Sequence, residues 1–145
     1  MKTLLQRILA CLAIAAAALA GIPAMAEVIS YKAELKGSNA VPPNKTTGTG
    51  SISAGYDTAD KKLSWKGNYS SLTGPVTAAH FHGPAAMGRN AGIAVGIATG
   101  NLPASFEGSA TLTDAQAADL MAGRWYFNLH TAGNPAGEIR GQVVK

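Results

Sequence analysis

Three histidines are the residues of this 145-residue chain with the clearest potential for chemistry. His80 and His82 lie two residues apart in a stretch typical of a β-strand, so their imidazoles point to the same face of a sheet. His130 lies in another stretch with strand character, and one ring from a second strand can join such a pair at a single point. Three imidazoles with an open coordination position suit copper or zinc. The first hypothesis is therefore a copper site, with zinc as the alternative ion.

Four further residues could assist such a site. Met87, in the glycine-rich loop after the histidine pair, could add a thioether ligand for Cu(I), with a surface or packing role as the alternative. Asn128 and Glu138 could orient the rings as hydrogen-bond acceptors, and Arg140 could attract a small anion. The alternative for Glu138 and Arg140 is an ordinary ion pair at the surface, which contributes little to stability.

Other chemistry finds little support in the sequence. The chain has no carboxylates at a spacing typical of glycoside hydrolysis, no nucleophile elbow and no phosphate-binding loop with Lys and Ser/Thr. It has no cluster of Lys and Arg with interleaved aromatic residues, so we expect no nucleic-acid partner. Its single cysteine, Cys11, lies in the N-terminal segment that we expect to be removed, which excludes thiolate chemistry from the mature protein.

The N-terminal 26 residues have the pattern of a secretory signal. Lys2 and Arg7 give a positively charged start, residues 8–20 are apolar, and Ala24-Met25-Ala26 is a cleavage site of the A-x-A type. The apolar run is too short to span a membrane. We therefore expect a single domain over residues 27–145, periplasmic or secreted and without a membrane span. Because two of the twelve basic residues lie in the signal, the formal net charge of +4 overstates how basic this domain is.

Short strands separated by turn residues dominate the rest of the chain. A capping box at Thr113 and Gln116 predicts one short helix that runs to Met121 and stops at Gly123. Strands are expected at 28–35, 51–56, 62–69, 76–82, 93–98, 105–112, 124–131 and 138–144. This pattern predicts an all-β fold, an antiparallel Greek-key-like sandwich or barrel of about eight strands with one short helix.

Alternation along the strands separates a core face from a polar face. In 124–131 it places Trp125, Phe127 and Leu129 on the core face and Tyr126, Asn128 and His130 on the other. In 76–82 it places the histidine pair on the same face as Val76 and Ala78, with Phe81 pointing away. His130 is therefore expected to point to a polar surface or cleft, and the small neighbours of His80 and His82 leave space beside their rings.

Five motifs occur in an order that identifies a family resemblance. They are Asn39-Ala40-Val41-Pro42-Pro43, Ala78-Ala79-His80-Phe81-His82-Gly83-Pro84, Leu112-Thr113, the run Ala122-Gly123-Arg124-Trp125-Tyr126-Phe127-Asn128-Leu129-His130-Thr131, and Gly137-Glu138-Ile139-Arg140-Gly141-Gln142. Together they resemble the CHRD domain, named for its occurrence in chordin and found alone in many exported bacterial proteins. The resemblance covers residues 31 to 144 and implies a compact all-β domain and a free-standing exported bacterial member. It names no reaction.

Two classes of function follow. The first is an exported metal-binding domain for metal handling, with copper or zinc on His80, His82 and His130. The alternative is an extracellular structural or adhesive module that contacts a protein or polysaccharide partner and binds no metal. A minority hypothesis within the first class is redox activity like that of copper-dependent superoxide dismutase.

Overall fold

The computed structural model describes residues 25–145, so the predicted signal segment lies almost entirely outside the described residues and stays a prediction. The described part contains eight strands, one short 3-10 turn at Gly37–Asn39 and one α-helix, which confirms the all-β prediction. None of the helices in residues 25–145 has the length and apolar character needed to cross a membrane. The elements are β1 (Val28–Lys36), β2 (Thr49–Asp57), β3 (Lys62–Ser70), β4 (Val76–His82), β5 (Ile93–Ala98), β6 (Ser105–Thr111), α1 (Asp114–Met121), β7 (Tyr126–Thr131) and β8 (Asn134–Gln142).

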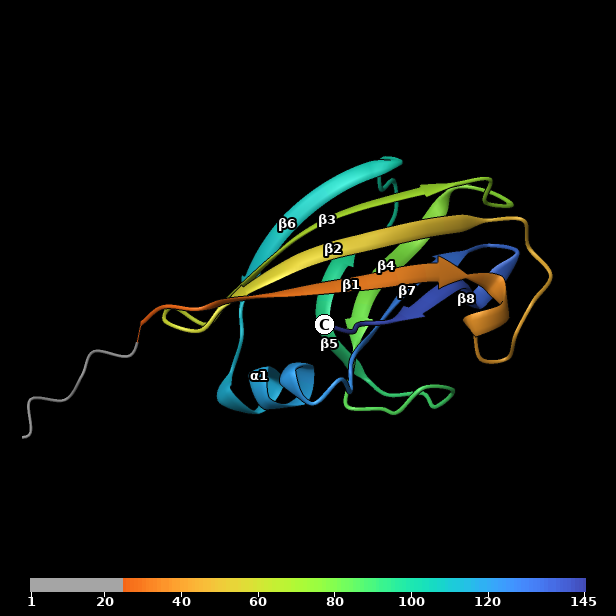
Figure 1. Ribbon diagram of the computed structural model, residues 1–145. Coiled ribbons are helices and arrows are strands. Elements are labelled where there is room, and N and C mark those ends of the chain that lie inside the picture. Colours follow the sequence, from red (N-terminus) through yellow and green to blue (C-terminus); the bar gives the residue numbers. More distant parts are fainter. Residues whose placement is uncertain (1–24) are drawn as a thin grey trace, which may run out of the picture.

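All eight strands belong to one antiparallel sheet with the order β5-β4-β7-β8-β1-β2-β3-β6. The sheet curls into a nearly closed barrel, with β1, β2, β3 and β6 on one side and β5, β4, β7 and β8 on the other (Figure 1). The two halves join where β8, the last strand, pairs with β1, the first. Because β4 pairs with β7, the two segments that carry the histidines become neighbours although about 50 residues separate them in the chain.

The core lies between the two sides of the barrel and is rich in aromatic rings. Phe81 packs edge-on against Trp65 and Phe127, with ring centroids 5.4 and 4.9 Å apart. Trp125, Phe127 and Leu129 are fully buried, as their alternation predicted. Val76 is also buried, and the expectation that it shares the histidines' face is wrong. A register shift between Val76 and Ala78 interrupts the alternation there and turns Val76 toward the core.

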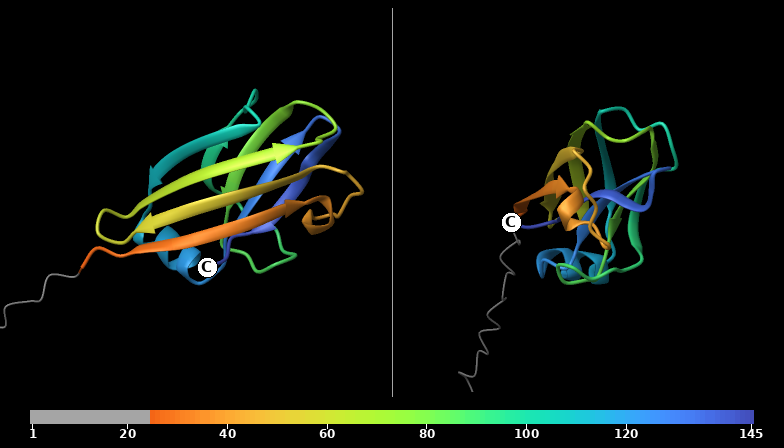
Figure 2. Two further views of the ribbon diagram at one scale, coloured as in Figure 1. Left: turned by 45° about the horizontal axis from the view of Figure 1, so that its top comes forward. Right: turned by 90° about the vertical axis from the view of Figure 1, so that its right-hand side faces the viewer.

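The short helix lies at one end of the barrel (Figure 2). The predicted capping box is present, since the Thr113 hydroxyl accepts from the Gln116 amide and the Gln116 side chain accepts from the Thr113 amide. Ala117 and Leu120 are the buried face of the helix and belong to the core. Gly123, at a φ of +71°, follows the helix in the left-handed region that glycine tolerates best.

The last hairpin is tighter than the sequence predicts. The strand expected from Glu138 begins at Asn134, which pairs with Thr131 across a two-residue turn. A register shift on β7 between Leu129 and Thr131 accommodates the extra residues of β8. This segment contains Pro135 and has Gly137 at a φ of +125°, both typical of turns, so its local sequence favoured a longer loop.

Candidate metal centre

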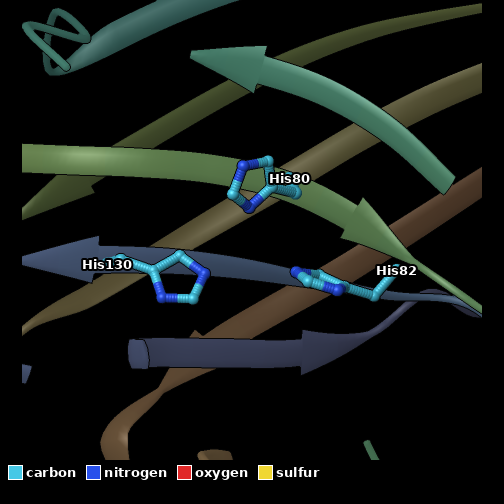
Figure 3. A group of neighbouring side chains, drawn as sticks. All are labelled: His80, His82 and His130. Atoms are coloured by element: carbon cyan, nitrogen blue, oxygen red, sulfur yellow. The ribbon is translucent and has the colours of Figure 1, made fainter. Parts of the chain in front are cut away.

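The three histidines lie together on the outer face of the barrel wall formed by β4 and β7 (Figure 3). His80 and His82 project from β4 on the side opposite to Phe81, which is buried in the core. His130 projects from β7, where it pairs with Ala78 and is therefore a diagonal neighbour of His80. The small side chain of Ala78 leaves room beside the rings. We call His80, His82 and His130 the histidine cluster.

The rings of the histidine cluster face a common point. The centroid of the His80 ring lies 5.3 Å from that of His82 and 5.4 Å from that of His130, and the centroids of His82 and His130 are 6.2 Å apart. One ring nitrogen from each residue can be chosen so that all three lie within 4.8 Å of one another. The geometry therefore agrees with the sequence-based prediction that two distant strands bring these three rings together.

Backbone carbonyls fix the orientation of two of the rings. Nδ1 of His82 lies 3.1 Å from the carbonyl oxygen of Ala91, and Nδ1 of His130 lies 2.9 Å from that of Pro135. A carbonyl oxygen only accepts, so each Nδ1 donates its proton and each Nε2 keeps a free lone pair. An N–H group held by a carbonyl on the far side of the ring is the usual support of a metal-ligating histidine.

Three buried ring nitrogens in the cluster have no hydrogen-bond partner among the described residues. They are Nδ1 of His80, Nε2 of His82 and Nε2 of His130, one from each ring. A buried polar atom without a partner costs about 1–3 kcal/mol, so native proteins leave few of them. Three such atoms, one on each of three neighbouring rings, could all be satisfied by a single ligand that the rings share.

The donor set and its spacing fit a metal ion. Zinc–nitrogen bonds of about 2.0–2.1 Å place tetrahedral ligand nitrogens about 3.3 Å apart. The cluster nitrogens, within 4.8 Å of one another, need to approach by no more than about 1.5 Å. Three protein ligands would leave a fourth position open.

The electrostatics of the cluster favour the neutral form of His80 and His82. Burial lowers the pKa of His80, and the nearby rings of His82 and His130 lower it further. Burial also lowers the pKa of His82, and His130 and Arg140 add to this effect, while the hydrogen bond to the Ala91 carbonyl opposes it. Only the neutral imidazole can coordinate a metal, so these shifts favour the ligating form.

Tyr126 and Arg140 form a stacked column beside the cluster. The Tyr126 ring lies parallel to that of His82, with centroids 4.8 Å apart, and the guanidinium carbon of Arg140 lies 3.4 Å from the Tyr126 centroid. The Tyr126 hydroxyl also bonds to the amide and the carbonyl of Ala91, the residue that orients His82. Sequence reasoning placed Tyr126 on the polar face and gave it no role. Its position directly across from His82 could have been found only with the pairing of β4 and β7.

Glu138 does not orient the rings, and it does not pair with Arg140. Its side chain is fully buried and accepts hydrogen bonds from the hydroxyls of Thr46, Thr73 and Thr131 and from the Thr73 amide. Burial raises the pKa of Glu138, but these hydrogen bonds outweigh it and hold the pKa below its usual value. The expectation of a surface ion pair is wrong, because the carboxylate is buried and accepts hydrogen bonds from three other segments of the chain.

Asn128 and Met87 are also separate from the rings. The Asn128 amide donates to the carbonyl of Ala136 at 3.3 Å, while its Oδ1 is buried without a partner and packs over Gly137. Asn128 therefore makes no hydrogen bond to a histidine, contrary to the expectation. Met87 is 77% exposed and lines a hollow together with Arg140, so the surface alternative is the one that its position favours.

One known family matches the chain. A family model described as the CHRD domain matches residues 31–143, which include the histidine cluster and both strands that carry it. Neither a curated protein nor a solved structure matches the chain. The arrangement of the site therefore stands on its own geometry.

Proposed function

This chain belongs to the CHRD domain family, and on that premise we propose that it is an exported metal-binding domain that holds one copper ion on the histidine cluster. The observation that carries the proposal is the set of three unpartnered ring nitrogens, one from each of His80, His82 and His130. Zinc is the second candidate ion. Export is proposed from the signal pattern of residues 1–26 and places the domain in the periplasm or outside the cell.

The choice of copper over zinc follows from the ligands. A site made of imidazoles alone follows the general affinity order, in which Cu²⁺ binds more tightly than Zn²⁺. No cysteine belongs to the cluster within the described residues, and thiolates would have favoured zinc or an iron–sulfur cluster. The neutral rings add no charge, so the bound ion would keep its full positive charge.

Holding and delivering the ion is the role that the geometry supports best. A bound copper ion would supply a Lewis acid or a one-electron couple at the open position. Within the described residues, however, no carboxylate belongs to the cluster, and Glu138 faces threonine hydroxyls instead. The cluster therefore offers no carboxylate as a separate acid or base for turnover. His80 lines a hollow of about 440 Å³ together with residues of β5, and this hollow is the route that we propose for exchange of the ion.

Metal titration of the purified protein tests the proposal. We expect uptake of one Cu(II) per chain, with nitrogen hyperfine structure in the EPR spectrum. His80→Ala and His130→Ala should each weaken binding by at least tenfold, because each removes one of three ligands. Met87→Ala is the matched control and should bind copper as the unsubstituted protein does, since its side chain points to solvent.

The alternative, an interaction module without metal, predicts a different outcome. If the protein and a variant with all three histidines changed to alanine take up the same amount of copper and zinc, the cluster is not a metal site. Export has its own test. Mass spectrometry of the protein recovered from its host should give a chain that begins at Glu27, and an uncleaved chain inside the cell would contradict export without bearing on the metal.

A further inference from the structure

Arg140 carries a buried positive charge that no carboxylate neutralises within residues 25–145. Its side chain is 2% exposed, and the ion pairs in this part of the chain involve other residues. Nη1 donates to the side-chain oxygen of Asn90 at 2.8 Å, and Nη2 donates to the carbonyl of Arg89. Both acceptors are neutral. A buried cation without a counter-ion is costly, so this position is complementary to an anion.

Arg140 is one of the residues that line a hollow on the surface. Its volume is about 410 Å³, and it lies between the loop that follows β1, the loop that follows β4 and the outer face of β8. Asn39 and Gln142 add polar groups beside Arg140, and Val41, Pro43 and Met87 form an apolar wall. Two of the five sequence motifs contribute residues to this hollow, Asn39–Pro43 and the motif that ends at Gln142. Neither motif contains a histidine of the cluster.

The guanidinium is held rigidly on the side of Tyr126 away from the metal centre. β7 lies between β4 and β8, so His82 on β4 and Arg140 on β8 flank the Tyr126 ring from opposite sides. The two bonds to the 83–92 loop fix the guanidinium further. A group held in place before binding loses little entropy when a ligand arrives, which favours affinity. None of the three histidines of the cluster lines the hollow, so the two sites are separate.

We propose that this hollow binds a small organic carboxylate. The carboxylate accepts from the N–H groups of Arg140 that the loop leaves free, and Asn39 and Gln142 provide further polar contacts. The apolar tail lies against Val41, Pro43 and Met87. The apolar wall favours an organic acid over an inorganic anion, because phosphate would leave this wall in contact with water. The proposal does not rest on the metal site.

Titration of the isotope-labelled protein with hexanoate tests this proposal. The protein is first passed over a chelating resin, so that metal binding does not affect the result. We expect saturable NMR shifts in the amides of residues 39–43 and 87–88 and in the Nε–H of Arg140. Hexanol, which lacks the charge, and inorganic phosphate, which lacks the tail, should each bind at least tenfold more weakly.

A pair of variants at Met87 separates charge from shape. Met87→Glu places a negative charge at the rim of the hollow, whereas Met87→Gln has nearly the same size and no charge. Both should fold, because Met87 is largely exposed. We expect hexanoate to bind Met87→Glu roughly tenfold more weakly than Met87→Gln. The proposal is overturned if the two variants bind equally, if hexanol or phosphate binds as well as hexanoate, or if no shift saturates. None of these outcomes bears on the copper site.

Discussion

The rings of His82 and Tyr126 lie face to face, with an interplanar angle of 2° and centroids 4.8 Å apart. They are directly opposite each other on β4 and β7, and both also contact Ala91 in the loop that folds over them. Through Tyr126, the loop that orients His82 is anchored to the barrel wall. We therefore expect Tyr126, which is not a ligand, to affect the metal affinity of the site.

Loss of the Tyr126 hydroxyl should weaken copper binding. Tyr126→Phe keeps the stack on His82 but removes the bonds to Ala91, so the carbonyl that orients His82 becomes less fixed. We expect about a tenfold loss of Cu(II) affinity, as for other partners of metal ligands, measured by competition with a chelator of known affinity. Tyr69→Phe is the control, since its hydroxyl donates to the carbonyl of Leu102 and makes no bond to the loop that orients His82. Equal affinities in the two variants would contradict a positioning role for Tyr126.

Copper should stabilise the folded protein. A ligand that binds only the folded state adds about 2.7 kcal/mol at a free concentration 100 times its Kd. For a domain of this size, such a gain raises Tm by roughly 10 °C. Calorimetry with and without copper measures the shift, and the variant with all three histidines changed to alanine should show none. A shift of the same size in that variant would mean that copper binds elsewhere.

The stability of the metal-free protein should fall in two steps as the pH is lowered. The folded-state pKa values of His80 and His82 lie below the unfolded value of about 6.5, so the unfolded state binds protons first. Their contribution is complete above about pH 6.5 and is lost as the pH falls through the folded pKa values. Denaturant unfolding at several pH values measures this step. It should be absent when both residues are changed to alanine.

The second step belongs to Glu138. Its folded-state pKa is also lowered, so its contribution is present above the usual glutamate value of about 4.3 and is lost as the pH falls through the folded pKa. Glu138→Gln should remove this step while leaving the histidine step in place. A curve that keeps both steps in this variant would assign the acid transition to another carboxylate.

The same substitution should destabilise the protein at neutral pH. Hydrogen bonds to a charged group contribute about 1.5–3 kcal/mol, and the amide of Glu138→Gln places N–H donors opposite threonine hydroxyls. We expect a loss of about 2 kcal/mol in the free energy of unfolding. Glu107→Gln is the matched control, because its exposed pair with Lys66 at 4.0 Å should change stability by less than about 0.5 kcal/mol.

The local sequence was sufficient to predict the secondary-structure elements and the face to which most side chains point. The alternation of Trp125, Phe127 and Leu129 predicted the core, and the capping box at Thr113 predicted the helix, because both patterns depend on residues within a few positions of each other. The i, i+2 spacing of His80 and His82 likewise put both rings on one face. Val76 and the start of β8 were predicted wrongly, because a register shift changes the alternation without a signal in the strand itself.

The tertiary structure decided which distant residues meet. The pairing of β4 with β7 brings His130 to the histidine pair and Tyr126 to His82, and the position of β8 beside β7 brings Arg140 to Tyr126. Glu138 and Arg140 are two residues apart, yet one accepts from threonine hydroxyls and the other stacks on a ring. Residue types and spacing along one strand set what each side chain can do. Which residue each side chain contacts depends on strand order and register, and these are set by packing across the whole barrel.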